Sequence, residues 1–271
     1  MTLEQQYTNG ITNTEFAGFV ANPNFGAFFS EKIVSVPPNG NIFIEDISAL
    51  EAMDFKYQKL AAENQRELIV FKAEELTAHL ATQLDQIPKS FGFVFPGNGS
   101  RIIQAIMQQS FPEILKNRPT MAVKTKRSRE NGVWSISVDV PDLDDTMRKC
   151  TDWVIVDDVV LSGQTAAALK QGITDKTERT TDSWTLATWL ALDPKRRKKI
   201  TKTNSASSVD GFDAVSAVVT YKGGNGIPPC NSLSTLLLPD EKGEAVREKL
   251  ASAYFPAGFE QFIQQLSHGT N

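Results

Sequence analysis

The sequence predicts an α/β fold with a largely parallel β-sheet flanked by helices. Residues 153–156 form an apolar run without polar alternation, which is typical of a strand buried on both faces of a sheet. Residues 91–95 form a similar run. Both runs lead through turn residues into helical segments, and strands that alternate with helices in this way favour a parallel sheet.

The other elements follow in chain order. Leucines on one helical face predict a helix over residues 74–84. Turn residues at 96–100 predict a loop, and apolar side chains on one side predict a helix over residues 101–109. Residues 133–140 alternate between polar and apolar types, so we expect an antiparallel strand with one solvent-exposed face. The remaining strands are expected at residues 120–123, 184–192 and 214–221.

Two adjacent carboxylates, Asp157 and Asp158, follow the apolar run at 153–156. Open α/β sheets bind ligands at the carboxyl ends of their strands, and carboxylates accept hydrogen bonds from vicinal hydroxyls. Residues 162–165 (Ser-Gly-Gln-Thr) then lead into an alanine-rich helix, whose first amides and two hydroxyls form a phosphate cradle. The segment predicts a site for a phosphorylated sugar. The alternative is a buried strand whose acids only cap the following turn.

Residues 154–166 (VIVDDVVLSGQTA) resemble the phosphoribosyl-pyrophosphate (PRPP) signature of type I phosphoribosyltransferases: an apolar run, two acids, a spacer, then Thr/Ser-Gly-x-Thr. Ser162 replaces the commoner Thr, and Gln164 replaces the usual second Gly. The resemblance implies that Asp157 and Asp158 hold the ribose hydroxyls and, through ligand and water, Mg²⁺. It implies that the 5-phosphate is bound by Val159, Val160, Leu161, Ser162, Gly163, Gln164 and Thr165.

The family's fold is a parallel sheet flanked by helices, with a flexible antiparallel flap and an added hood. Carried over, the resemblance divides the chain into an amino-terminal hood (1–72), a phosphoribosyltransferase-like α/β core (73–238) and a carboxyl-terminal helical extension (239–271).

A glycine-rich segment follows the run at 91–95, where the family binds pyrophosphate. Glycines let backbone amides approach an anion, a helix N-terminus attracts it, and an arginine makes bidentate contacts. The alternative is a plain strand-to-helix turn with the arginine in solvent. The residues concerned are Gly97, Asn98, Gly99, Ser100 and Arg101.

Residues 124–132 hold four cations and end in Asn-Gly, a hairpin turn signal. In the family, a mobile hood at this place closes over the active site and excludes water. Lys126 and Arg127 are the expected catalytic contacts to pyrophosphate; the alternative is a solvated hairpin tip.

Two later segments carry weaker predictions. Family members often contact the acceptor base after the last core strand, and a structural loop is the alternative there. The basic run at 195–199 could attract RNA, but it lacks interleaved aromatic residues for base stacking, and a solvated face is the alternative. The expected acceptor-binding residues are Lys222, Gly223, Gly224, Asn225 and Gly226.

Composition narrows the class of protein. The chain has 271 residues, of which 41% are hydrophobic and 22% charged, as in ordinary globular proteins. A net charge of -4 argues against general affinity for nucleic acid, and two cysteines imply no disulfide framework. No signal peptide and no membrane-spanning stretch is recognised, so we expect a cytoplasmic protein without a membrane partner.

These observations, with the resemblance, predict a phosphoribosyltransferase. It would use Mg²⁺, transfer the 5-phosphoribosyl group of PRPP to a nitrogen of a nucleobase-like or other aromatic acceptor, and release pyrophosphate. The resemblance also implies a homodimer. The alternatives are a non-catalytic PRPP- or nucleotide-binding regulator, a PRPP synthetase-like enzyme and an RNA-interacting protein. The sequence shows no second similar domain and no clear ATP site, which disfavours the synthetase.

Overall fold

The computed structural model describes residues 14–16, 19–22, 26–37, 40–45, 54–130, 133–193, 212–223, 230–232, 241–253 and 255–268. The chain divides into two compact units. The larger unit comprises Glu15–Val34 and Leu76–Lys222, and the smaller includes Ser35–Glu75 and Gly223–Asn271. In the described residues, no helix has the length and apolar character needed to cross a membrane.

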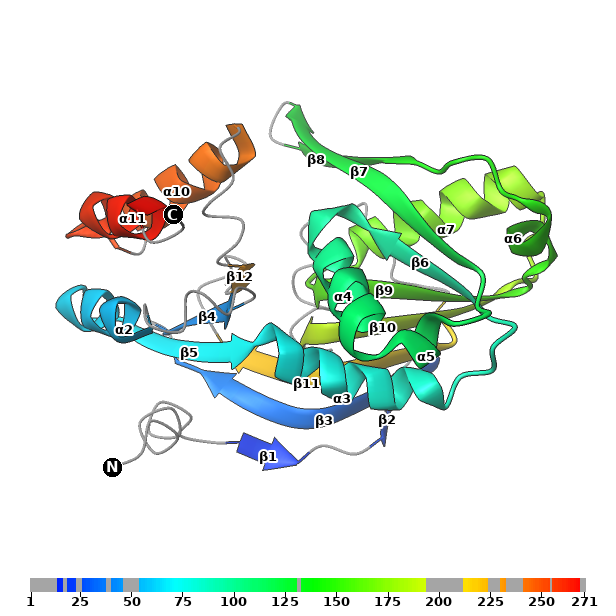
Figure 1. Ribbon diagram of the computed structural model, residues 1–271, viewed down its shortest axis with the longest axis horizontal. Coiled ribbons are helices and arrows are strands. Elements are labelled where there is room, and N and C mark those ends of the chain that lie inside the picture. The colour runs from blue at the N-terminus through cyan, green and yellow to red at the C-terminus, as the bar shows by residue number, and fades with distance from the viewer. Residues whose placement is uncertain are drawn as a thin grey trace. The chain divides into compact units, whose positions relative to one another are not determined.

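A nine-stranded sheet runs through the described part of the larger unit, in the order β1-β3-β11-β10-β9-β6-β7-β8 with β2 paired to β3 (Figure 1). The run from β11 through β10, β9 and β6 to β7 is parallel. The pairs β7–β8 and β2–β3 are antiparallel. This confirms the predicted α/β fold with a mostly parallel sheet and an antiparallel hairpin. The strands are β1 (Thr14–Phe16), β2 (Phe19–Asn22), β3 (Gly26–Val36), β6 (Gly92–Pro96), β7 (Thr120–Glu130), β8 (Val133–Asp139), β9 (Asp152–Val160), β10 (Ser183–Leu192) and β11 (Ala214–Gly223).

Helices cover both faces of this sheet. On one face, Leu169 and Ile173 of α7 belong to a buried cluster with Trp153 and Ile155 of β9. Alternate strand residues point to the opposite face, where α4 contacts β6, β7 and β9. The helices of this unit are α3 (Ala73–Asp85), α4 (Gly97–Ser110), α5 (Pro112–Leu115), α6 (Asp145–Lys149) and α7 (Gln164–Thr177).

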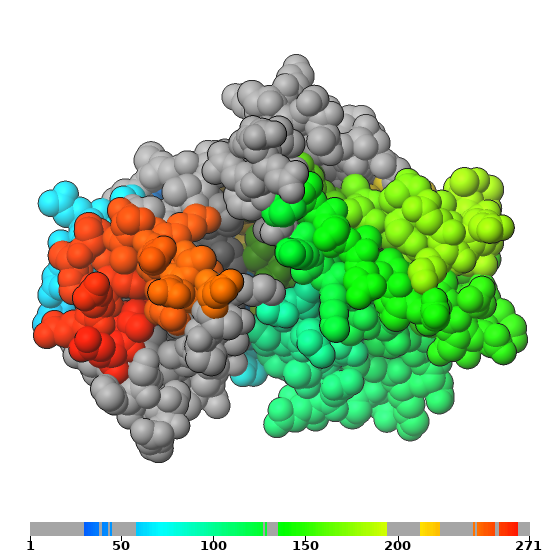
Figure 2. Space-filling model, turned by 90° about the horizontal axis from the view of Figure 1, so that it is seen from above, coloured from blue at the N-terminus to red at the C-terminus, as the bar shows by residue number. Residues whose placement is uncertain are grey.

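Helix α7 packs directly on the hairpin strand β8. A Cβ added to Gly172 would lie 2.9 Å from Val140 Cγ2 and 3.0 Å from Val138 Cγ2, so only glycine allows this approach. Figure 2 shows α7, in yellow-green, beside the green residues that precede it in the chain.

The amino-terminal edge of the sheet is closed by a polar network around Asp182. The indole rings of Trp153 and Trp184 stack with centroids 5.7 Å apart, and Trp153 Nε1 donates to Asp182 Oδ2 at 2.8 Å. Arg179 Nε donates to Asp182 Oδ1 at 2.9 Å, and its other nitrogens donate to the carbonyl oxygens of Arg148 and Cys150. The hydrogen bond to Asp182 raises the pKa of Arg179 above its ordinary value.

The smaller unit has its own parallel sheet, in the order β12-β4-β5 among the described strands. Its helix α2 connects β4 to β5, which makes a βαβ unit. The side chain of Asn64 donates to Ala257 O and accepts from Ala257 N, which ties the end of α2 to the turn before α11. The elements are β4 (Gly40–Glu45), α2 (Asp54–Glu63), β5 (Glu67–Lys72), β12 (Cys230–Ser232), α10 (Glu241–Ala253) and α11 (Phe259–His268).

The two units divide the chain differently from the three predicted segments. Strand β12, which lies within the predicted core at 73–238, pairs with β4, and the unit that includes Ser35–Glu75 also includes Gly223–Asn271. The division into three segments stays a prediction. Glu15–Val34, placed in the predicted hood, belongs to the larger unit because most of β3 and its partner strands extend the main sheet. A register between strands distant in sequence has no local signal, so the pairing of β12 with β4 could not be predicted from the sequence.

Candidate active site

The order of the strands marks one point of the large sheet. From β6 the chain passes through α4 to β7, on one side of β6. From β9, on the other side of β6, it passes through α7 to β10, in the opposite direction. In open α/β sheets, ligands bind at the carboxyl ends of strands where the order reverses in this way. The carboxyl ends of β6 and β9 therefore define the candidate site.

Both predicted acids lie within β9, because its pairing with β10 continues to Val160. This corrects the shorter strand expected at 153–156. Thr188 pairs with Asp157 and Leu190 with Val159. Thr188 Oγ1 donates to Asp158 O at 3.0 Å, so a side chain of β10 holds the carbonyl of Asp158.

The two carboxylates point to opposite faces of the sheet. Trp153 and Ile155 face α7, so alternation places Asp157 on that side and Asp158 on the α4 side. Asp157 is buried, with 8% of its surface exposed, and its Oδ1 accepts from Asp158 N at 3.0 Å. Asp158 is half-buried, and its Oδ1 accepts from Val159 N at 2.8 Å.

The predicted phosphate loop leads directly into α7, which begins at Gln164. Gly163 is the N-cap residue, with a φ of 80° that favours glycine. Ala167 N donates to Gly163 O at 2.9 Å, which is the i→i−4 bond that follows an N-cap at Gly163. Ser162 Oγ accepts from Gln164 N at 3.4 Å, and Thr165 is buried in the first turn. This local structure is the expected helix N-terminus with hydroxyls beside it.

The predicted loop at 96–100 is the first turn of α4, which starts at Gly97 immediately after β6. Gly97 has a φ of 65°, and a Cβ there would lie 2.8 Å from Thr125 Oγ1. Ser100 is fully buried, and its hydroxyl donates to Pro96 O. Asn98 and Arg101 are exposed. The loop prediction is therefore wrong. Gly, Asn and Gly have low helix propensity, and tertiary packing overrode it.

The start of α4 lies against the Asp158 carboxylate. A Cβ added to Gly99 would overlap Oδ2 and Cγ of Asp158 and would lie 2.8 Å from Oδ1. Because helical Cα–Cβ bonds tilt toward the N-terminus, the carboxylate sits beside the first turn of α4. A negative group there interacts favourably with the helix dipole. No ion pair in the described part of the chain involves Asp158.

The hairpin prediction is corrected in its extent. Strand β7 pairs with β6 only as far as Pro96↔Val123 but continues to Glu130, so the cations at 124–129 lie in a strand and not in a loop (Figure 1). Lys126 pairs with Ser137 and is exposed. The backbone of Arg127 pairs with Ile136, and its side chain lies outside the described residues. Strand β7 continues beyond Val123 because each of its residues from Lys124 to Glu130 pairs with a residue of β8.

Other predicted residues are only partly described. Lys222 is half-buried in β11, and Gly223 ends that strand. Gly224, Asn225 and Gly226, like the basic run at 195–199, lie outside the described residues. The acceptor-binding prediction therefore stays a prediction.

Sequence reasoning missed two residues of this edge. Thr188, fully buried, holds the Asp158 carbonyl, and it is one of two threonines in the otherwise apolar strand at 184–192, so its hydroxyl alone did not single it out. Thr125 contacts the Gly97 turn from β7, which the sequence does not show because 28 residues separate the two. Gly99 was selected for amide access, whereas the structure shows a close approach to Asp158.

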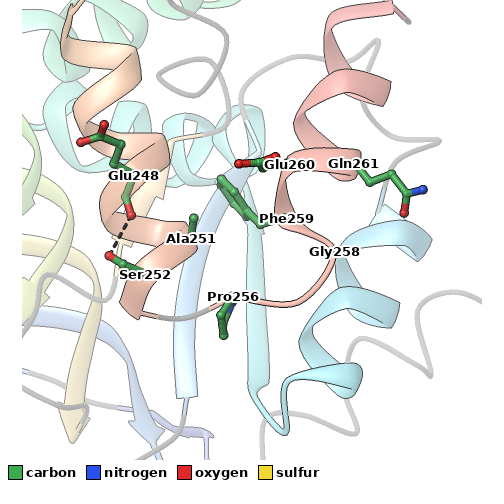
Figure 3. Close-up of a pocket in the computed structure, with 8 residues that line it drawn as sticks. All are labelled: Glu248, Ala251, Ser252, Pro256, Gly258, Phe259, Glu260 and Gln261. Carbon is green, nitrogen blue, oxygen red and sulfur yellow. Dashed lines mark hydrogen bonds between the residues drawn. The ribbon is translucent and has the colours of Figure 1, made fainter.

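A hollow lies in the smaller unit, between α10 and α11 (Figure 3). Its volume is about 600 Å³, and its eight lining residues include Glu248 and Glu260 but no basic side chain. Two carboxylates without a cation disfavour a phosphorylated ligand. The carboxyl edge of the large sheet is therefore the better candidate for such a ligand.

No family model matches this chain, and no curated protein matches it. Several solved structures align with it. A hypothetical protein from Neisseria gonorrhoeae with bound ppGpp is 16% identical, with 64% of this chain and 92% of that chain covered and a TM-score of 0.39. A purine phosphoribosyltransferase from Pyrococcus horikoshii Ot3 is 16% identical, over 55% and 87%, with a TM-score of 0.34. The xanthine-guanine-hypoxanthine phosphoribosyltransferase of Helicobacter pylori is 13% identical, over 54% and 85%, with a TM-score of 0.35.

Proposed function

We propose that the chain is a PRPP-dependent phosphoribosyltransferase. One observation carries the proposal: two helix N-termini, on opposite faces of the sheet, flank a pair of carboxylates at the topological switch point. A ligand that fits carries anionic groups at both ends and hydroxyls between them. PRPP has this distribution of groups.

The residues take complementary roles in this proposal. The 5-phosphate lies at the start of α7, on residues 159–165, where helix amides and the Ser162 hydroxyl face it. Asp157 and Asp158 accept from the ribose hydroxyls. The pyrophosphate lies toward residues 97–101, where Arg101 is exposed, with Lys126 and Arg127 on the hairpin. Lys222 and residues 223–226 are the proposed acceptor contacts.

Magnesium fits these residues only as an ion held mainly by ligand and water. No group of three or more His, Cys, Asp or Glu side chains in the described residues could hold a metal alone. Two carboxylates at the edge suit Mg²⁺, which keeps several waters and uses few protein ligands. When bound, it would neutralise charge on the leaving pyrophosphate.

Transfer requires no protein nucleophile. The bond between ribose C1 and the pyrophosphate oxygen breaks with its electron pair on pyrophosphate. A nitrogen of the aromatic acceptor forms the new bond to C1 and gives up its proton to water or to the departing pyrophosphate. Arg101, Lys126 and Arg127 stabilise the departing charge, and an acid of β9 orients the ribose.

The test combines PRPP, Mg²⁺ and a panel of purine, pyrimidine and other aromatic acceptors. Pyrophosphate release that depends on one acceptor would support the proposal. Saturable PRPP binding without release for any acceptor would favour the non-catalytic regulator. Absence of PRPP binding would contradict both functions. Oligomeric state, for which we propose a homodimer, is measured by light scattering on the same sample.

A further inference from the structure

We infer that Asp158 is an internal anion, which occupies the N-terminus of α4 until an anionic ligand displaces it. The inference rests on the proposed function and deepens it. It assigns the two neighbouring acids different tasks, with Asp157 on the α7 face and Asp158 as an ordering device on the α4 face.

The close approach of α4 to β9 is the first support. Both carboxylate oxygens and Cγ of Asp158 lie where a side chain at position 99 would begin. Only glycine leaves this space to the carboxylate. The side chain is directed further by Val159 N, which donates to Oδ1 at 2.8 Å, and by Thr188, which holds the Asp158 carbonyl at 3.0 Å.

The charges around this contact are the second support. The first amides of an α-helix have no partner within the helix and carry partial positive charge. The Asp158 carboxylate, at the Cβ position of Gly99, therefore lies close to the place in which a ligand's anionic group would be stabilised. A pyrophosphate group entering this place meets a like charge, which costs interaction free energy at short distance. The carboxylate must move away or be neutralised.

Displacement would couple the two ends of the ligand. Once a ligand anion takes the start of α4, the Asp158 carboxylate is released at the same sheet edge, where ribose hydroxyls lie in the proposed complex. Asp158 is thus a positioning residue before the ligand binds and a ligand contact afterwards.

The first experiment uses inorganic pyrophosphate as the probe, with EDTA present, and measures its affinity by calorimetry. Asp158→Asn keeps the shape of the side chain but removes its charge. We expect it to bind pyrophosphate roughly tenfold more tightly than the wild-type chain, because a like charge has been removed. Asp145→Asn is the matched control, since Asp145 is an exposed acid in α6, which precedes the amino end of β9. Equal or weaker binding by Asp158→Asn, or no binding by either chain, would overturn the inference.

A second experiment tests the contact without any ligand. Gly99→Ala in the wild-type chain forces the carboxylate away, and we expect Tm to fall by about 5 °C. In an Asp158→Ala background the same change should leave Tm level or raise it, since alanine favours helix over glycine. The same fall in both backgrounds would show that Asp158 does not occupy this place.

The outcomes separate the inference from the proposed function. If the wild-type chain binds PRPP and Asp158→Asn shows no gain in pyrophosphate affinity, the internal anion is contradicted and the proposed transferase function stands. If Asp158→Asn gains pyrophosphate affinity but neither chain binds PRPP, the internal anion is supported and the transferase function is contradicted.

Discussion

The two edges of the large sheet treat acidic side chains differently. At the amino edge, Asp182 accepts from Trp153 and from two nitrogens of Arg179, and its side chain is 2% exposed. At the carboxyl edge, Asp158 lies beside the first turn of α4, without an ion pair in the described part of the chain. The first arrangement satisfies a buried carboxylate within the protein. The second leaves a carboxylate beside the start of a helix at the carboxyl ends of the strands, which is the reason to propose a ligand site there.

The largest expected effect comes from removing both acids of the carboxyl edge. Asp157→Asn with Asp158→Asn should lower phosphoribosyl transfer by about 10³-fold or more, because ribose contacts and charge stabilisation are lost together. Turnover is measured by pyrophosphate release, and circular dichroism checks that the fold is intact. Full activity in the double variant would place the chemistry elsewhere.

The next largest effect is expected from a change at the amino edge of the sheet. Asp182→Ala leaves the Arg179 guanidinium and the Trp153 indole without their acceptor, so we expect the free energy of unfolding to fall by about 3 kcal/mol. Thermal unfolding should show a Tm lower by roughly 6–12 °C. PRPP affinity, measured below the transition, should stay unchanged. A loss of PRPP affinity without a loss of stability would contradict a purely structural role for the amino edge.

A smaller effect is expected at the start of α7. Gly163 has a φ of 80°, so Gly163→Ala introduces about 1–2 kcal/mol of strain and disturbs the phosphate loop. We expect PRPP affinity to weaken by roughly tenfold, as measured by calorimetry. Ala168→Gly, in the same helix, is the control: it should lower stability by about 1 kcal/mol and leave affinity alone. Equal affinities for both variants would argue against this phosphate site.

The smallest effect concerns Cys150 at the amino edge. Burial raises the pKa of its thiol above the ordinary value, and the Arg179 charge opposes this. A raised pKa favours the protonated form in the folded state. The resulting stability is present below the unfolded pKa and is lost as the pH rises through the folded pKa. In a Cys230→Ser background, native Cys150 should react with iodoacetamide several-fold more slowly at pH 8.5 than in urea. Equal rates would mean that the thiol is exposed.

Much of this architecture could be predicted from local pattern. The apolar runs at 91–95 and 153–156 identified β6 and β9, because strands buried on both faces lack polar alternation. The helix N-terminus at Gln164 was predicted from the residues at 162–165, and the roles of the two acids and of residues 159–165 toward a ligand stay predictions. The predictions that failed concerned segments whose structure depends on other parts of the chain. Strand β7 extends to Glu130 because β8 pairs with it, and α4 begins at Gly97 despite a glycine-rich sequence.

The same reason explains the missed contacts of the site. Gly99 against Asp158, Thr125 against Gly97 and Thr188 on the Asp158 carbonyl all join different elements. Alternation along a strand also separates neighbours in sequence, so Asp157 and Asp158 serve opposite faces. The two acids are adjacent in the sequence, but only the strand geometry shows that Asp158 lies on the α4 side, against Gly99.

The most direct test of the central claim is a thermal shift of the wild-type chain with PRPP and Mg²⁺, compared with the Asp157→Asn/Asp158→Asn variant. At about 100 times the dissociation constant, binding should stabilise the protein by about 2.7 kcal/mol. For a chain of this size, Tm should rise by roughly 5–10 °C in the wild type and stay constant in the variant. No shift in the wild type, or an equal shift in both, would contradict a PRPP site at the carboxyl edge.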